Sequence, residues 1–325
     1  MEYVVCDICP RQCRLKSGQT GVCRARQNVD GRIVLLTYGL PCSVNVDPVE
    51  KKPLYHFLPG SKTFSIGMAG CNINCLNCQN AEISQSGPLG LPAYELPSGA
   101  TVAAATERGC PSISYTYTEP LVAFEYVRDC AEAARRAGVR NVLVTAGYGT
   151  PATISELAKV IDAANVDLKS IDDKFYREIC GVNSVKPVLD ALNRWREAVV
   201  WLEVTVLLIP TKNDSDKAIS DLVNWVVANL GREVPIHFSR FFPIHRLTEL
   251  PPTPIETLAR AVEIANAAGL VYAYTGNADV DGGSDTVCAG CGEVLIRRQR
   301  FSVFDNRLQE GKCVSCGRVA TGVWR

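Results

Sequence analysis

Short hydrophobic segments alternate with longer amphipathic ones through the middle of the chain. Six short segments rich in β-branched or aromatic residues are predicted strands: "TFSIGM" (63–68), "SISYTY" (112–117), "NVLVTAG" (141–147), "VDLKS" (166–170), "VWLEVTVLLIP" (200–210) and "IHFSRFF" (236–242). "LVYAYTG" (270–276) could form a seventh. Such regularly spaced short runs are typical of a sheet built from repeated units.

Between these strands lie segments whose apolar residues recur with helical spacing. The predicted helices are 121–138, 154–164, 186–198, 218–231 and 255–269, and several end at a glycine. Strands alternating with helices indicate an α/β fold with a parallel sheet. A closed eight-stranded barrel typically takes ~250 residues. We therefore expect a partial (β/α)6 barrel resembling part of a TIM barrel.

The flanking regions differ from this repeating middle part. Residues 1–60 are rich in turns and cysteine and are predicted to form a metal-bound segment with a connector. Residues 61–280 would form the partial barrel. Residues 281–325 are short, basic and cysteine-bearing, which predicts a separate small module.

Composition and charge exclude some classes of protein. The chain has 325 residues, 47% of them hydrophobic, and equal numbers of basic and acidic residues, 34 each. Its overall charge therefore does not attract nucleic acid. Neither a membrane-spanning apolar run nor a signal peptide is evident, so we expect a cytoplasmic protein that does not bind membranes.

Cysteine changes the picture most. Eleven of the 15 cysteines fall into three groups, and in a reducing compartment such groups indicate metal or redox chemistry rather than disulfides. The groups are Cys6, Cys9, Cys13 and Cys23; Cys71, Cys75 and Cys78; and Cys288, Cys291, Cys313 and Cys316.

The central group lies in "GCNINCLNCQN", directly after the first predicted strand. A [4Fe–4S] cluster has four irons that thiolates usually bind, so three thiolates leave one iron open to another ligand. The alternatives are a zinc site completed by one of three histidines, His56, His237 or His245, or three ordinary core cysteines.

C-x3-C-x2-C after a first strand resembles the radical S-adenosylmethionine (SAM) superfamily. The segments "VEKKPLYHFLPGS", "YTYTEP", "VDLKS", "LEVTVLLIPTKND", "PIHFSRFFP" and "YTGN" are similar in order and spacing to its activating-enzyme group, which includes pyruvate formate-lyase activating enzyme. The resemblance implies that SAM binds the open iron. One electron from the cluster would then cleave SAM to a 5'-deoxyadenosyl radical, which abstracts hydrogen from a substrate.

With "CDICPRQC" and the C-terminal cysteine pairs, the chain resembles the AmmeMemoRadiSam system branch. This resemblance implies Memo-like and AMMECR1-like proteins as candidate partners, a one-electron donor such as flavodoxin or ferredoxin, and a protein substrate. The last would follow from kinship with glycyl-radical activating enzymes.

The resemblance also assigns residues. It implies that the three central cysteines bind the cluster and that six further residues contact SAM: Glu119, Asp167, Lys169, Ile209, Pro210 and Asn213. Tyr117 and Thr118 stand where the family has two glycines before the glutamate, and Asn77 stands where an aromatic residue is usual.

Several of these residues have structural alternatives. Glu119 could simply start a helix, and Asp167 and Lys169 could form a strand-end ion pair. His237 and Arg240 either reach the substrate end of the barrel or are a core histidine and a surface arginine.

The C-terminal pairs form two C-x2-C-G knuckles, which predict a closed four-thiolate site holding zinc or a rubredoxin-like iron. Their segment has a net charge of +4. This positive charge is too modest to predict nucleic-acid binding. The N-terminal C-x2-C-x3-C-x9-C set suits zinc or a second iron–sulfur cluster.

Two hypotheses of different classes follow. The first is a radical SAM enzyme whose substrate is unidentified. The second is a non-catalytic metal-binding adaptor that docks nucleic acid or protein, with no cluster on the central loop.

Overall fold

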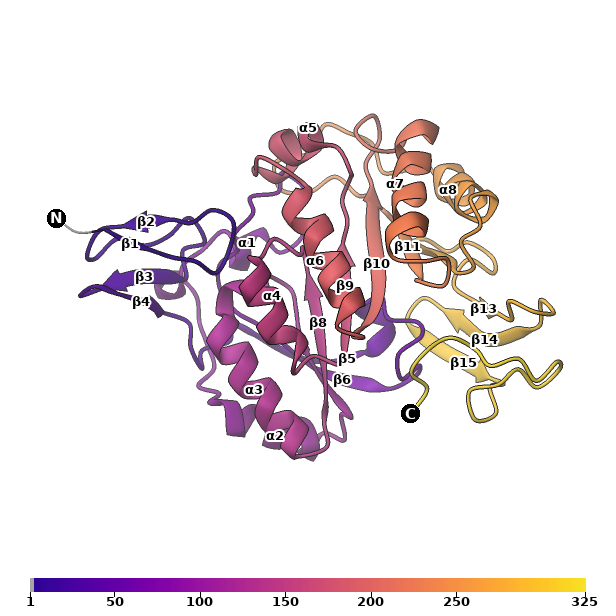
Figure 1. Ribbon diagram of the computed structural model, residues 1–325, viewed down its shortest axis with the longest axis horizontal. Coiled ribbons are helices and arrows are strands. Elements are labelled where there is room, and N and C mark those ends of the chain that lie inside the picture. Colours follow the sequence, from indigo (N-terminus) through magenta and orange to yellow (C-terminus); the bar gives the residue numbers. More distant parts are fainter. Residues whose placement is uncertain (1–2) are drawn as a thin grey trace.

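One mostly parallel sheet organises the structure, a computed structural model that describes residues 3–325 (Figure 1). Its eight strands are β5 (Ser43–Pro48), β6 (Lys62–Gly67), β7 (Ser112–Tyr115), β8 (Arg140–Thr145), β9 (Ala163–Asp167), β10 (Trp201–Leu208), β11 (Ile236–Arg240) and β12 (Ala273–Gly276). They lie in sequence order from β5 to β12. All neighbours are parallel except β5 and β6.

Helices connect the parallel strands. The longer ones are α2 (Ser98–Glu107), α3 (Phe124–Arg136), α4 (Pro151–Ala158), α6 (Lys186–Glu197), α7 (Asp216–Asn229) and α8 (Ile255–Ala267). Right-handed crossovers in a sequential strand order place successive helices on the same face of a sheet. Accordingly α2 packs beside α3, α4 beside α6 and α7 beside α8 (Figure 1). The opposite face is the barrel interior.

This architecture confirms the predicted α/β fold with an open, partial barrel. All seven predicted strands are present, including the one at 270–276. The predicted helix over 154–164 is wrong at its end, because α4 stops at Ala158 and β9 begins at Ala163. The apolar pair Ala163 and Ala164 continued the helical pattern, but both residues lie fully buried in the sheet. The antiparallel edge strand β5 was not predicted.

The N-terminal region forms two small hairpins. Strand β1 (Val4–Val5) pairs with β2 (Arg14–Leu15), and β3 (Arg26–Val29) pairs with β4 (Arg32–Leu35). Arg26 is buried and reaches across to the barrel, where it donates to the Val122 carbonyl (2.8 Å) and forms an ion pair with Glu125. The hairpins are thereby fixed against the first helical layer.

The C-terminal region forms a three-stranded antiparallel sheet of β13 (Thr286–Val287), β14 (Val294–Gln299) and β15 (Ser302–Asn306). Val323, near the end of the chain, is joined to the connector before β6 by two backbone hydrogen bonds. Leu58 N donates to Val323 O, and Val323 N donates to His56 O (2.7 Å each). The chain leaving β12 folds back so that Gly283 O accepts from Thr275 N (2.8 Å).

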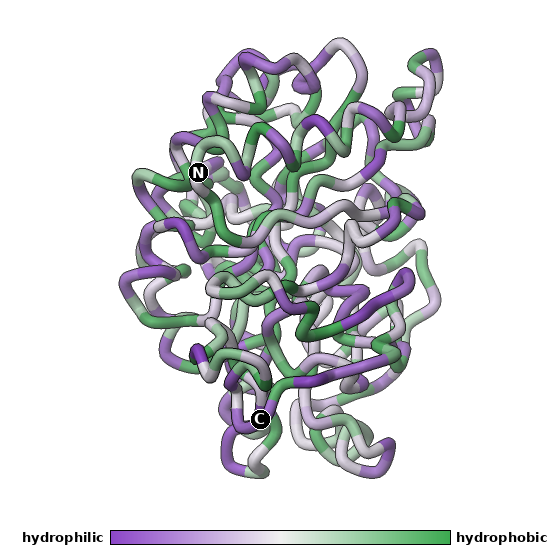
Figure 2. Tube along the Cα trace, turned by 90° about the vertical axis from the view of Figure 1, so that its right-hand side faces the viewer, coloured by the Kyte–Doolittle hydropathy of each residue, from purple (hydrophilic) through white to green (hydrophobic). Residues whose placement is uncertain are grey.

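Hydrophobic stretches along the chain are short and interrupted by hydrophilic residues (Figure 2). Within residues 3–325, no helix has both the length and the apolar character that crossing a bilayer requires.

Arg298 joins the C-terminal region to the barrel. Its side chain is fully buried, with Nε 3.6 Å from the carboxylate of the equally buried Glu50, and it donates to the Tyr55 carbonyl (2.6 Å). Its guanidinium also lies 4.4 Å from the centre of the Tyr55 ring. The two regions thus share a buried ion pair.

We expect Arg298→Met to lower the free energy of unfolding by about 3–5 kcal/mol, because it leaves the Glu50 carboxylate buried without its cation. Chemical denaturation measures this change. The neighbouring Arg297 is exposed, so Arg297→Met should stay within about 0.5 kcal/mol of wild type. An Arg298→Met protein as stable as the Arg297→Met protein would contradict this account.

Candidate functional site

The three central cysteines lie on a loop, 68–80, that follows β6 at the carboxyl edge of the sheet. A short π-helix, Tyr176–Cys180, holds this loop on one side: Asn74 N donates to Cys180 O and Leu76 N donates to Ile179 O (2.9 Å each). Loop backbone groups that would otherwise be buried without partners are thereby satisfied.

Two arginines from distant parts of the chain hold the same loop. Arg246 donates to the backbone carbonyl and the side-chain oxygen of Asn74 (3.1 and 2.7 Å). Arg11 donates to Asn72 O and, at 2.8 Å, to Gly181 O. The loop is therefore positioned by residues from the middle and the last part of the barrel segment and from the N-terminal region.

Gly70 shows how closely the N-terminal region approaches. Its φ is +95°, and a Cβ at this position would lie 2.3 Å from the backbone oxygen of Cys23. Only glycine fits both the left-handed backbone and the contact. The first central cysteine thus follows a residue packed against the N-terminal cysteine group.

The three sulfurs lie in different surroundings. Cys71 is buried, and burial together with the nearby Glu119 carboxylate raises its pKa well above the usual range. A hydrogen bond from the Cys180 thiol lowers the pKa of Cys75, and the Lys169 ammonium acts in the same direction. Cys78 is half-buried and its sulfur lies 3.2 Å from the hydroxyl of buried Ser84.

A cavity of about 480 Å³ opens beside these sulfurs at the carboxyl ends of the strands, and we call it the chamber. Its wall includes all three central cysteines, residues from β8, β9 and β10, and the turn that follows β7. Among them are Asn77, Tyr117, Glu119, Thr145, Asp167, Lys169, Thr205 and Leu207. Functional groups of β/α barrels lie at this end.

Glu119 is buried at the start of a 3-10 helix, Pro120–Ala123, and caps it by accepting from Leu121 N (3.1 Å). Its carboxylate also accepts from the Thr145 hydroxyl (2.5 Å) and from Ala146 N (2.8 Å). Burial raises the pKa of Glu119 to about 7 despite these hydrogen bonds. Glu119 therefore starts a helix, as the structural alternative predicted, and it also lines the chamber.

Asp167 and Lys169 form an ion pair at the end of β9, with Nζ 2.8 Å from Oδ2. Burial alone would lower the pKa of Lys169, but the Asp167 carboxylate and the nearby thiols raise it well above its usual range. Both residues line the chamber as well. The ion pair thus places one negative and one positive group on its wall.

Ile209, Pro210 and Asn213 are buried after β10 and are absent from the chamber wall. The Asn213 side chain accepts from Ile209 N (2.7 Å) and donates to Lys169 O (2.7 Å) and Leu207 O (2.9 Å). It therefore joins the ends of β9 and β10. The contact of Ile209, Pro210 and Asn213 with SAM stays a prediction.

Tyr117 keeps a glycine-like backbone in place of the family's glycine, with φ +70°. Its hydroxyl donates to the Asp47 carboxylate (2.5 Å), and the Lys52 ammonium lies 4.6 Å from its ring centre. Burial lowers the pKa of Lys52 to about 8, although Asp47 opposes this shift. Sequence reasoning missed this cluster because Asp47 and Lys52 come from the unpredicted edge strand and its connector.

The C-terminal cysteines converge as predicted. Their four sulfurs lie within 4.8 Å of one another, with Cys288 to Cys316 at 3.6 Å and Cys291 to Cys313 at 3.7 Å. A tetrahedral ion with metal–sulfur bonds of ~2.3 Å requires sulfurs about 3.8 Å apart. Gly290 N and Ser315 N each donate to a cysteine sulfur at 3.4 Å. The site therefore fits a single metal ion.

The N-terminal cysteines line one small enclosed cavity together with Asn72 and Arg26. Cys6, Cys9 and Cys23 are buried and Cys13 is half-buried. Among the cysteine groups of residues 3–325, only the C-terminal one has its sulfurs close enough together to bind a single metal ion.

Comparisons with known proteins agree with this geometry. Residues 65–223 match the family model of the radical SAM superfamily. An uncharacterized protein of Methanocaldococcus jannaschii is 41% identical over 97% of this chain and 94% of its own. GTP 3',8-cyclase of Haemophilus influenzae is 28% identical over 56% of this chain and 52% of its own. Isethionate sulfite-lyase activating enzyme of Oleidesulfovibrio alaskensis is 26% identical over 40% of each chain.

A solved radical SAM methyltransferase from Sphaerobacter thermophilus shares the fold, with a TM-score of 0.51 and 18% identity over 67% of this chain and 66% of that one. The open parallel sheet and the three-thiol loop are those of a radical SAM fold. The chain belongs to the radical SAM superfamily. Membership supports an enzymatic function, and the comparisons give no support to a non-catalytic adaptor.

Membership also implies a [4Fe–4S] cluster and SAM, and the residues present fit both. Three thiols border the chamber, and thiolates are the usual ligands of such clusters. The chamber wall carries carboxylates that suit an ammonium group and a lysine that suits a carboxylate. Asn77 Oδ1 is a buried acceptor without a partner in the described chain, as expected beside a polar ligand.

We expect the Cys288→Ser/Cys313→Ser variant to lose one metal ion per chain, because two ligands of the C-terminal tetrahedron are removed. Elemental mass spectrometry of the purified protein measures the loss and distinguishes zinc from iron. Cys42→Ala, which alters a cysteine outside the three groups, should keep the wild-type metal content. Equal metal content in all three proteins would show that the C-terminal sulfurs hold no ion.

Proposed function

We propose that the chain is a radical SAM enzyme that uses Cys71, Cys75 and Cys78 to hold a [4Fe–4S] cluster and SAM in the chamber. The observation that carries this proposal is the opening of a three-thiol loop onto a polar chamber at the carboxyl edge of the sheet. The bound cluster would supply the electron that cleaves SAM to a 5'-deoxyadenosyl radical, which abstracts hydrogen from the substrate.

The residues of the chamber have separate tasks in this proposal. Glu119 and Asp167 offer carboxylates to the SAM ammonium, and Lys169 offers an ammonium to its carboxylate. The unpaired Asn77 oxygen can accept from the amino group of adenine, in place of an aromatic contact. Ile209, Pro210 and Asn213 would support the adenine end from behind Leu207, since they lie outside the wall.

The chain would consist of a metal-bound N-terminal segment with connector (1–60), the partial barrel (61–280) and a zinc-ribbon or rubredoxin-like module (281–325). Cys288, Cys291, Cys313 and Cys316 would hold zinc, or iron. Cys6, Cys9, Cys13 and Cys23 would hold zinc or a second iron–sulfur cluster.

We further propose an activating-enzyme type of reaction with a protein substrate and a one-electron donor such as flavodoxin or ferredoxin. Its support is the similarity to isethionate sulfite-lyase activating enzyme, of which the chain matches less than half. The AmmeMemoRadiSam resemblance would add Memo-like and AMMECR1-like proteins as partners. A glycyl radical on a partner protein, detected by electron paramagnetic resonance, would identify such a substrate.

We expect the anaerobically reconstituted and reduced protein to convert SAM to 5'-deoxyadenosine. The Cys71→Ala/Cys75→Ala/Cys78→Ala variant should form none and should lose the iron of one cluster, because all thiolate ligands are gone. Chromatography of the product and iron analysis measure both quantities. The Cys42→Ala/Cys110→Ala variant is the control and should behave as wild type. A triple variant with unchanged iron content and product formation would refute the proposal.

We expect SAM binding to tighten as the pH rises through 7, because Glu119, with a pKa of about 7, attracts an ammonium only when ionised. Between about pH 6 and pH 7.5 its ionised fraction rises about eightfold. Anaerobic calorimetry measures the SAM Kd over this range. Glu119→Gln should bind SAM more weakly and lose this pH dependence, whereas Glu156→Gln, an exposed position on α4, should retain it. A pH dependence that survives in Glu119→Gln would assign it to another group.

A further inference from the structure

A second cavity, of about 530 Å³, adjoins the chamber, and we call it the side cavity. It lies at the carboxyl ends of β11 and β12, and its wall also includes residues of the segment 277–284 and of the turn between β14 and β15. The chamber and the side cavity share five wall residues: Pro53, Gln79, Ser239, Asn277 and Phe301. A molecule held in the side cavity would therefore reach the edge of the chamber.

Among the lysines and arginines that line the chamber and the side cavity, Arg240 is the one without a carboxylate partner in the described chain. Five lysines and arginines line the two cavities: Lys51, Lys52, Lys169, Arg240 and Arg300. The other four lie within 4.0 Å of Asp47, Asp167 or Asp279, but within residues 3–325 Arg240 has no such carboxylate. Its Nε donates to Thr253 O (2.7 Å), and its guanidinium lies 5.0 Å from the Phe242 ring centre.

The acidic residues of the side cavity are already neutralised. Glu50 lies against buried Arg298, and Asp279 forms an ion pair with Arg300 (3.2 Å). Arg240 therefore carries the unbalanced charge of the cavity wall. A half-buried guanidinium of this kind favours an anionic partner with which it can form charge-assisted hydrogen bonds.

His237 supplies a second polar group at the cavity floor. Its Nε2 lies 2.7 Å from the fully buried carboxylate of Glu203. Burial alone would raise the pKa of Glu203, but the hydrogen bond from His237 lowers it. Nδ1 of His237, which also lines the side cavity, has no hydrogen-bond partner in the described chain.

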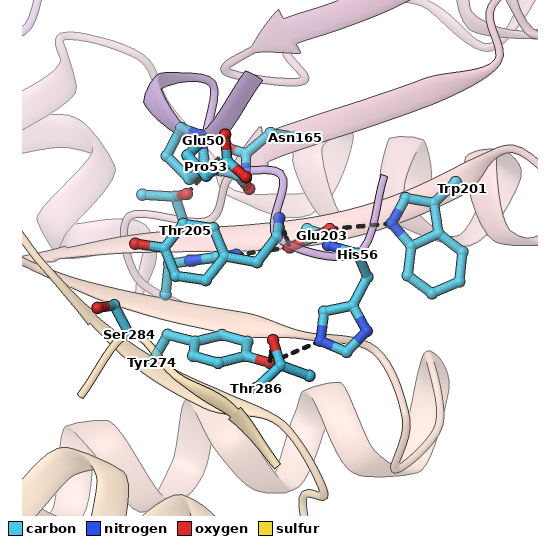
Figure 3. Close-up of polar contacts among 12 residues, drawn as sticks. Glu50, Pro53, His56, Asn165, Trp201, Glu203, Thr205, Tyr274, Ser284 and Thr286 are labelled. Atoms are coloured by element: carbon cyan, nitrogen blue, oxygen red, sulfur yellow. Dashed lines mark hydrogen bonds and ion pairs between the residues drawn. The ribbon is translucent and has the colours of Figure 1, made fainter. Parts of the chain in front are cut away.

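Three further donors fix the Glu203 carboxylate: Tyr55 N (3.0 Å), His56 N (2.8 Å) and the Trp201 indole (3.0 Å). Figure 3 shows Trp201 directed at Glu203, and His56 directed at the Tyr274 hydroxyl (2.6 Å). Because this network is saturated, neither Glu203 nor the His237 ring can turn without breaking buried hydrogen bonds. The floor of the side cavity is thus preorganised.

We propose that the side cavity is the substrate site and that Arg240 binds a carboxylate or phosphate group of the substrate. His237 Nδ1 would form a hydrogen bond with a polar group on the same molecule, and the part to be attacked would extend past Ser239 and Asn277 into the chamber. This inference rests on the proposed function and specifies the chemical class of its substrate.

The C-terminal module belongs to this site. The turn between β14 and β15 places Arg300 and Phe301 on the wall, and Phe242 and Phe301 leave 44% and 38% of their surfaces exposed beside Arg240. These two rings can cover the apolar part of a substrate whose charged group is held at Arg240.

The test is chemical protection of Arg240 in the reconstituted, anaerobic protein. Phenylglyoxal modifies accessible arginines, and peptide mass spectrometry measures the rate at each position. With SAM present throughout, inorganic phosphate and glutarate are the anionic probes, and glutaramide is the neutral control. We expect one of the anions, according to whether the site suits phosphate or carboxylate, to slow modification of Arg240 by about tenfold, which is worth ~1.4 kcal/mol. Glutaramide should not.

Arg260 is the internal control, because it is paired with Asp216 and lies on α8 outside both cavities. Its modification rate should not respond to any probe. The inference is wrong if neither anion protects Arg240 beyond Arg260, or if SAM alone protects Arg240 completely, since that residue would then hold SAM. Formation of 5'-deoxyadenosine without anion protection overturns this inference alone, whereas absence of 5'-deoxyadenosine under every reducing condition overturns the proposed function and the substrate site with it.

Discussion

The structure depends on the clamping of the three-cysteine loop between segments that are far apart in the chain. The loop has little regular secondary structure, so its backbone groups must find partners elsewhere. They find them in the π-helix before Gly181, in Arg246 and in Arg11 of the N-terminal region. The close contact of Gly70 with Cys23 completes the clamp. The geometry of the central thiols is therefore coupled to the N-terminal cysteine group, and whatever orders that group also orders the loop.

A second buried interaction organises the opposite side of the barrel. Glu203 accepts four hydrogen bonds from the connector, from its own strand and from β11, and His56 continues the network to the C-terminal region through Thr321 O (2.6 Å). Burial lowers the pKa of His56 to about 4, so its ring stays neutral, with Nδ1 donating to the Thr321 carbonyl and Nε2 accepting from the Tyr274 hydroxyl. The network and the Arg298–Glu50 pair together make the C-terminal module part of the barrel wall.

Periodicity and residue spacing in the sequence were sufficient to predict the local elements of the structure. The strands, most helices and the three cysteine groups follow from local patterns, because each needs only neighbours along the chain. Contacts between distant segments could not be predicted in this way. The unpaired state of Arg240 becomes visible only when every carboxylate of the described residues has been placed. Likewise the positive φ of Tyr117 and its contacts with Asp47 and Lys52 link parts of the chain that local patterns do not connect.

An open barrel has a cost that a closed one avoids, because it leaves sheet edges able to pair with another chain. At the β12 edge, the hydrogen bond from Thr275 N to Gly283 O occupies a donor that would otherwise point outward. The segment that makes this bond is the one that leads into the four-cysteine module. The four-cysteine module therefore does more than line the side cavity. It also anchors the segment that covers the edge of β12, so that this strand is not free to pair with a strand of another chain.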